Sequence, residues 1–128
     1  MENLAEIAPL AGTLGIEVDH AAPEEVRGGM DWAPEKCTAA CVLHGGAIMA
    51  FADTLGGVCA FLNLPDGATT TATVESKTNF FRAVRSGRVS GVTRPLHVGR
   101  SFIVVQTDVL DGMERRVAQV TQTQAVLS

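Results

Sequence analysis

The sequence contains no tyrosine, a single tryptophan and five phenylalanines, and its three cysteines form no C-x-x-C pair. Cys37, Cys41 and Cys59 are odd in number, which does not fit a disulfide framework, and the missing C-x-x-C spacing gives no zinc signature. We therefore expect no metal ion and no redox cofactor. The small number of aromatic residues does not decide between an aryl and an aliphatic ligand pocket.

Signals for export and membrane insertion are lacking too. Residues 1–6 do not combine a basic region with an apolar stretch, as a secretory signal does. The longest apolar run includes Asp53 and is shorter than the ~20 residues that a membrane-spanning helix needs. A cytoplasmic protein without membrane contact is expected. Since repeats and linkers are also lacking, the 128 residues are interpreted as a single domain, 1–128.

Basic residues are scarce early in the chain: apart from Arg27, Lys36 and Lys77, all of them lie after residue 81, and the net charge is −4. Such an acidic chain is a poor general binder of nucleic acid, although its arginines suit a small polyanion such as a nucleotide phosphate. Hydrophobic residues make up 46% of the sequence, which is rich for a domain with so limited an interior. We therefore expect a homo-oligomer.

Hydrophobic spacing predicts an α+β protein. A buried helix is expected from His44 to Asn63, because the stretch is apolar on nearly all sides and Pro65 follows in a turn. Helical spacing favours a shorter amphipathic helix near the N-terminus, and alternating or β-branched residues bounded by turns favour strands. These elements are expected at residues 4–14 (helix) and at 15–20, 25–32, 69–81, 88–96, 102–110 and 115–127 (strands).

The last four strands follow one another through short turns, which predicts an antiparallel sheet. Strict alternation along residues 69–81 places Thr71, Thr73 and Glu75 on one face of that strand. A curved sheet wrapped around the long helix covers one side of it, and a partner subunit can cover the other.

The start of the long helix, His44-Gly45-Gly46, is a candidate anion site. Backbone N–H groups in a first helical turn lack partners within the helix and lie at the positive end of its dipole. Gly45 and Gly46 are therefore placed to stabilise a developing oxyanion, and glycine lets a carbonyl group approach the backbone closely. The alternative is a Gly-Gly pair that serves only as a loop hinge.

Asp53 is the carboxylate of the apolar helix and the candidate base or nucleophile. Seven residues separate it from Gly46, so both lie on one helix face, roughly 10.5 Å apart along the axis. That distance is too long for one chain to complete a site. A two-fold dimer with antiparallel helices would bring Asp53 of one subunit toward Gly46 of the other. The alternative is a carboxylate that only pairs locally at an interface.

Three motifs together resemble the hotdog-fold acyl-CoA thioesterases, in the branch similar to phenylacetic-acid-pathway and 4-hydroxybenzoyl-CoA thioesterases. They are His44-Gly45-Gly46 with an acid nine residues after the histidine, the segment 79–84 before Gly87, and the segment 97–101. The resemblance implies a curved antiparallel sheet around one central helix. It also implies hydrolysis of an aryl- or medium-chain acyl-CoA, in a site shared across a dimer, with dimers pairing into a tetramer. The CoA moiety then belongs to the substrate.

Further candidates complete the site that the resemblance implies. His44 is expected to orient the carbonyl or the oxyanion donors, or else only to cap the helix. Thr54 and Thr73 are candidates to orient water or the carboxylate, the alternative being ordinary helix and strand threonines. Thr38 stands where the family often has asparagine, so the resemblance does not carry over a second hydrogen bond to the nucleophilic water or the carbonyl. Arg82, Arg85, Arg100 and Ser101 are expected to contact the CoA phosphates and nucleotide.

Two other functions stay open. A non-catalytic acyl-CoA-binding module would need the arginines but not Asp53. A hotdog enoyl-CoA hydratase or dehydratase would need an acid–base pair, and its D-x-N-x-x-H signature is missing from the sequence. The missing G-x-S-x-G elbow also argues against a serine hydrolase. The Gly56-Gly57 pair inside the helix predicts a close approach, by a partner helix in the favoured interpretation or by an acyl group.

Overall fold

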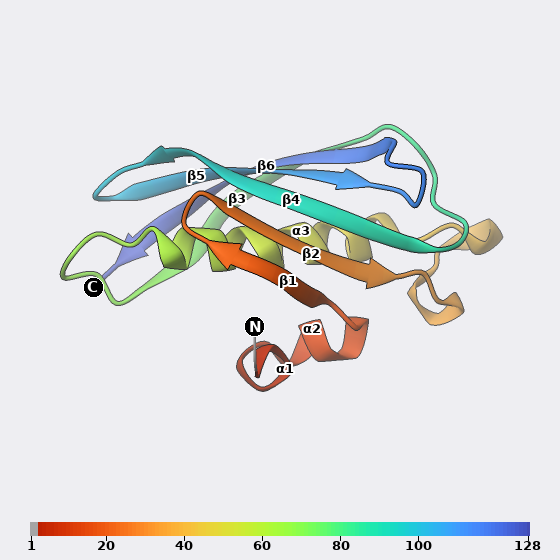
Figure 1. The fold of residues 1–128 in the computed structure, drawn as a ribbon, viewed down its shortest axis with the longest axis horizontal. Helices are drawn as coiled ribbons and strands as arrows, with labels where there is room; N and C mark the ends of the chain where they lie inside the picture. The colour runs from red at the N-terminus through yellow and green to blue at the C-terminus, as the bar shows by residue number, and fades with distance from the viewer. Residues whose placement is uncertain (1–2) are drawn as a thin grey trace.

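The computed structural model describes residues 3–128, which form one antiparallel sheet of six strands in the order β1-β2-β4-β5-β6-β3 and a long helix, α3 (Figure 1). The predicted hotdog-like arrangement, a curved sheet around one central helix, is confirmed. The elements are α1 (Leu4–Ile7), α2 (Pro9–Leu14), β1 (Glu17–Ala22), β2 (Glu25–Asp31), the 3-10 turns η1 (Pro34–Lys36) and η2 (Ala39–Cys41), α3 (Gly45–Leu62), β3 (Thr70–Phe80), β4 (Arg88–Val98), β5 (Phe102–Leu110) and β6 (Arg116–Leu127).

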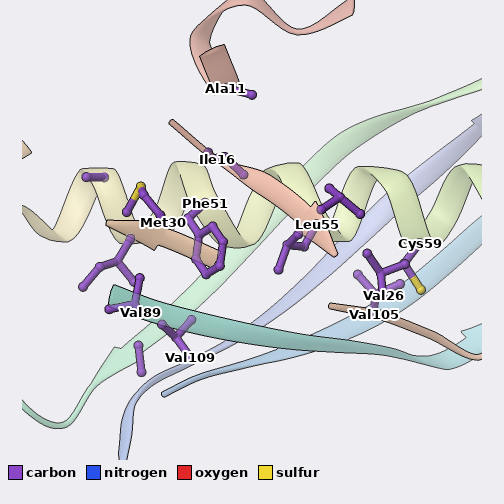
Figure 2. Close-up of a cluster of buried hydrophobic side chains, with 14 of the residues drawn as sticks. Ala11, Ile16, Val26, Met30, Phe51, Leu55, Cys59, Val89, Val105 and Val109 are labelled. Carbon is purple, nitrogen blue, oxygen red and sulfur yellow. The ribbon is translucent and has the colours of Figure 1, made fainter. Parts of the chain in front are cut away.

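The core lies between α3 and the concave face of the sheet, and α3 contacts all six strands. Phe51, Leu55 and Cys59 point from α3 into this core and are fully buried (Figure 2). The helix lies close to the sheet because Gly28 on β2 and Gly91 on β4 pair directly opposite each other. A Cβ atom at position 91 would lie 2.6 Å from Cδ1 of Leu55. The two adjacent glycines thus leave room for side chains of α3 to pack directly against the backbone of the sheet.

The predicted limits of α3 are confirmed by its caps. His44 has an extended backbone and accepts a hydrogen bond from the Gly46 amide, as an N-cap residue does. At the other end Asn63 donates from Nδ2 to the carbonyl oxygens of Cys59 and Pro23, at 2.8 and 2.7 Å. This second bond ties the end of the helix to the β1–β2 turn.

Within one chain α3 is covered on one side only, by the sheet, and cover of its other side by a partner subunit stays a prediction. One face is buried under the sheet, whereas Phe61 on the opposite side is 52% exposed and Met49, on the flank near the start of the helix, is 37% exposed. By length and composition α3 would suffice to cross a membrane, but it is the core helix of this fold. The apolar composition of α3 therefore serves a sheet on one side and leaves the other side open.

The N-terminal helix is broken where one helix was predicted. Ala8 separates α1 from α2, because the residue before a proline is disfavoured in helical conformation and Pro9 follows. Leu4 and Ala11 pack into the core, whereas Ile7 is 71% exposed.

Strict alternation along β3 is also wrong. The register between β3 and β6 shifts between Thr73 and Glu75, so Val74 is an extra residue in the strand. Thr73 therefore shares the inner face with Ser76 and Thr78 instead of with Glu75. β3 is an edge strand of the sheet, paired only with β6 within the described residues.

Candidate active site

Asp53 lies in the middle of α3 and its carboxylate is held by two residues of the sheet. Oδ1 accepts hydrogen bonds from Oγ1 of Thr73 at 2.7 Å and from Nε2 of Gln122 at 2.8 Å. Thr73 comes from β3 and Gln122 from β6, so the carboxylate joins the helix to two adjacent strands. The structure thus brings together Asp53 and Thr73, both of which were candidates in the sequence.

The Thr73 hydroxyl is itself fixed by a further side chain. Nε2 of Gln124 donates to Oγ1 of Thr73 at 2.7 Å. Gln122 and Gln124 are 0% and 1% exposed. Sequence reasoning missed both glutamines. The available signal was the alternation in β6, in which Val120, Gln122 and Gln124 occupy equivalent positions on the core-facing side.

Gly56 makes room for this cluster. A methyl group at position 56 would overlap Oε1 of Gln122, whereas a methyl group at Gly57 would meet no atom within 4 Å. The close approach predicted for the glycine pair is therefore made at Gly56 by a strand of the same chain. Gly57 borders open space beside Asp53.

The start of α3 holds the other half of the candidate chemistry. Nδ1 of His44 accepts the backbone N–H of Gly46 at 2.7 Å. A neutral imidazole that accepts at Nδ1 carries its proton on Nε2, which makes Nε2 a donor. The amide of Gly45 has no acceptor within residues 3–128, since the first hydrogen bonds to the helix carbonyls come from Ala47 and Ile48.

A pocket of about 330 Å³ adjoins this helix start. Its lining includes Thr38, Gly45 and Arg82, together with the rings of Phe80 and Phe81. Two backbone bonds hold the walls together: the amide of Leu43 donates to the Val84 carbonyl at 2.8 Å, and that of His44 to the Lys36 carbonyl at 2.9 Å. The structure therefore groups Thr38 and Arg82 with the His-Gly-Gly turn.

A second pocket of about 390 Å³ adjoins Asp53. Thr54, Gly57, Val58 and Phe61 of α3 and residues of α1 and β3 complete its mainly apolar lining. Thr54 donates its hydroxyl to the Ala50 carbonyl at 2.8 Å, so this proton is directed into its own helix. Asp53 is the one titratable side chain among the lining residues that the structure describes.

The two pockets share no lining residue, so a single chain presents two half-sites. Gly46 and Asp53 lie in one continuous helix, roughly 10.5 Å apart along its axis. The arginines divide in the same way. Arg82 and Arg85 lie in the connection from β3 to β4, near the start of α3 (Figure 1).

Arg100 and Ser101 lie in the turn from β4 to β5, at the opposite end of the molecule (Figure 1). Arg100 lines a pocket of about 310 Å³ with Asp66 and Gly67. Ser101 accepts the Val126 amide at its carbonyl, 2.9 Å away. One chain therefore does not bring the four predicted CoA contacts together. Among residues 3–128, histidine, cysteine and carboxylate side chains form no cluster of three or more suited to a metal ion.

Comparison with known families and structures agrees with this geometry. An antiparallel sheet wrapped around one central helix is a hotdog fold. Residues 41–118 match the family model of the thioesterase superfamily. The chain belongs to this superfamily, and the family-level expectation from its motifs is confirmed.

Similar proteins include two named thioester hydrolases. The chain is 31% identical over 125 residues to the proofreading thioesterase EntH of Cronobacter turicensis, with 98% of this chain and 90% of that protein covered. It is 30% identical over 118 residues to the 1,4-dihydroxy-2-naphthoyl-CoA hydrolase of Escherichia coli, with 92% and 86% covered.

Solved structures of thioesterases share the fold closely. A thioesterase from Haemophilus influenzae superposes with a TM-score of 0.91 at 28% identity, over 99% of this chain and 90% of that one. A mutant thioesterase from Pseudomonas aeruginosa gives a TM-score of 0.90 at 26% identity, over 98% and 90%. These likenesses extend over nearly the whole of the described chain.

Proposed function

We propose that this protein hydrolyses an acyl-CoA thioester to a free acid and CoA. The observation that carries the proposal is the carboxylate of Asp53, fixed by two strands beside a mainly apolar pocket in a member of the thioesterase superfamily. Such a pocket suits an acyl group, and the carboxylate suits a general base or a nucleophile.

The oxyanion half-site lies at the start of α3. The thioester carbonyl enters the pocket beside Gly45 and accepts hydrogen bonds from first-turn amides, whose dipoles favour the negative charge of the tetrahedral intermediate. The Gly45 amide is available directly. The Gly46 amide must be shared with, or released by, Nδ1 of His44, whose Nε2–H supplies a further donor. Thr38 stands in the same pocket, where its hydroxyl can orient the substrate.

Asp53 of the partner subunit completes the site in this proposal. It takes a proton from water as the oxygen of that water adds to the carbonyl carbon, and the C–S bond then breaks as the thiolate of CoA accepts a proton. Direct attack by the carboxylate, followed by hydrolysis of the anhydride, is the nucleophilic variant. Thr73 orients the carboxylate, and Thr54, the residue that follows Asp53 in α3, lines the same pocket.

A two-fold dimer accounts for the division into half-sites. Antiparallel α3 helices would place Asp53 of each subunit toward the helix start of the other. The same operation brings Arg100 and Ser101 of one subunit toward Arg82 and Arg85 of the other, which gathers the predicted CoA contacts. The free edge of β3 and exposed Val74 (58%) and Phe80 (50%) support an interface on this side. Pairing of dimers into a cytoplasmic tetramer completes the proposal.

The acyl group is proposed to be aryl or medium-chain. The sequence motifs resemble those of the branch similar to phenylacetic-acid-pathway and 4-hydroxybenzoyl-CoA thioesterases, and the naphthoyl-CoA hydrolase of Escherichia coli is a relative named for an aryl thioester. A pocket of about 390 Å³ beside Asp53 is large enough for such a group.

The test is thiol release from a panel of aryl- and acyl-CoA esters by the wild type and by Asp53→Asn. We expect the variant to lose about 10² to 10⁴-fold in kcat, the usual contribution of a positioned acid or base. Equal rates in both proteins would refute the assignment of Asp53. Tight ester binding by both, without turnover of any ester, would select the acyl-CoA-binding module instead.

A further inference from the structure

We infer that Gln122, Thr73 and Gln124 are positioning residues: Gln122 and Thr73 bind Oδ1 of Asp53, Gln124 holds the Thr73 hydroxyl, and Oδ2 is left as the oxygen that acts on water or on the acyl carbon. This inference rests on the proposed function, because it needs Asp53 to be catalytic. It adds two residues of β6 to a site otherwise built from α3, β3 and the loops that flank the helix.

The direction of the hydrogen bonds supports the assignment of Oδ1. Gln124 donates to Thr73, Thr73 donates to Asp53, and Gln122 donates to the same oxygen of Asp53. The two donors at Oδ1 direct their protons toward it, so this oxygen serves as an acceptor. A protonated Oδ1 would have to compete with two donors for the same space.

The second carboxylate oxygen is left for chemistry. Oδ2 of Asp53 has no hydrogen-bond partner among residues 3–128, and Asp53 lines the pocket of about 390 Å³ with mainly apolar neighbours. No other titratable group lines that pocket within the described chain, and the strands that face the carboxylate present glutamine and threonine there. One oxygen is therefore fixed to the sheet, while the other is free of hydrogen bonds from the described residues on a side chain that lines the pocket.

The arrangement is rigid, as a positioning role requires. Gln122 and Gln124 are fully buried on β6, between β5 and β3, so their backbones are held on both sides. Oε1 of Gln122 lies against Gly56 and has no hydrogen-bond partner in the described structure. A buried, unsatisfied amide oxygen is costly, and native proteins retain few of them. Its retention here is explained if the other end of the amide, Nε2, is needed at Asp53.

The experiment compares Gln122→Met with Gln119→Met. Methionine keeps the length of the side chain and removes the donor. Gln119 is a matched control because it also lies on β6 and also donates to an aspartate, Asp108 at 3.1 Å, but does so on the other face of the sheet. We expect Gln122→Met to lower kcat by about 10-fold or more, with KM changed by less than about 3-fold, and Gln119→Met to behave like the wild type.

The pH profile gives a readout that a purely structural role would not move. Donors to the charged form favour ionisation, so removal of one shifts the acidic limb of kcat/KM to higher pH. Gln122→Met should show this shift and Gln119→Met should not. Equal rates and equal acidic limbs in the two variants would overturn the inference.

Thr73 supplies a second route if Gln122→Met does not fold. Thr73 is exposed, so Thr73→Val replaces no buried side chain, although it removes the acceptor of the Gln124 amide, and Thr73→Ser restores the hydroxyl. A lower rate in Thr73→Val that is recovered in Thr73→Ser supports the inference, whereas a fully active Thr73→Val overturns it. Asp53→Asn separates the two claims: an active Asp53→Asn refutes the proposed function, while an inactive one beside an unaffected Gln122→Met and Thr73→Val refutes only the positioning role.

Discussion

The Cα atom of Gly56 on α3 lies against the side-chain amide of Gln122 on β6, so that any methyl group at position 56 would overlap Oε1 of that glutamine. The contact explains why a residue that disfavours helix stands in the middle of the central helix. It also couples the packing of the helix to the hydrogen bond that Gln122 gives to Asp53.

The glycine pair of α3 offers a matched test of this contact. Gly57→Ala adds a methyl group in open space and is expected to raise the free energy of unfolding by about 0.5 to 1 kcal/mol, the difference in helix propensity. Gly56→Ala should instead lower it by about 1 to 3 kcal/mol, because the amide of Gln122 must move. Urea denaturation measures both. Stabilisation by both alanines would show that Gln122 does not constrain position 56.

His44 is predicted to act as a helix cap and also in catalysis. His44→Ala removes the acceptor of the Gly46 amide and should cost about 1 kcal/mol of stability, whereas His44→Asn restores a good cap. Asparagine does not extend a donor as far as Nε2 of the imidazole, so kcat should stay low in both variants. Thermal unfolding and thiol-release rates measure the two effects. A wild-type rate in His44→Asn would show that His44 serves only as a helix cap.

Sharing of the site between subunits predicts complementation. Asp53→Asn and Gly45→Val disable different half-sites, the second by filling the pocket beside the helix start. Each variant alone should be inactive. A refolded equimolar mixture should regain about one quarter of the wild-type rate, because half of the dimers are hybrids with one intact site of two. A mixture as inactive as its components would contradict the shared site, provided that hybrid dimers are detected.

Cys59 predicts a loss of stability at alkaline pH. Burial raises the pKa of its thiol from 9.0 to about 11. The folded protein therefore keeps a proton that the unfolded chain loses, and the free energy of unfolding falls as the pH rises between these two values. Cys59→Ala lacks this titration, so its stability should fall less over the same range. Urea denaturation across the range measures the difference between the two proteins, and parallel curves would contradict the prediction.

Much of the fold could be predicted because it depends on local patterns. His44 and Asn63 were identifiable as the limits of α3 from an apolar run between a Gly-Gly pair and a proline turn. The strands followed from β-branched residues between turns. Thr73 was identified as a candidate by its type, but strict alternation placed it with Glu75. The extra residue Val74 puts Thr73 and Glu75 on opposite faces of the strand. A bulge of this kind depends on how β3 pairs with β6, and the sequence of β3 alone does not specify that pairing.

The sequence by itself determined the order of helices and strands, the His44-Gly45-Gly46 helix start and the carboxylate at Asp53, because each depends on neighbouring residues in the chain. Only the tertiary structure decided which oxygen of Asp53 is bound, which glutamines bind it and why position 56 is glycine. Gln122 is 69 residues from Asp53 in sequence, and the two meet only because β6 pairs with β3 under the helix. Contacts of that kind are set by the three-dimensional packing of the sheet against α3.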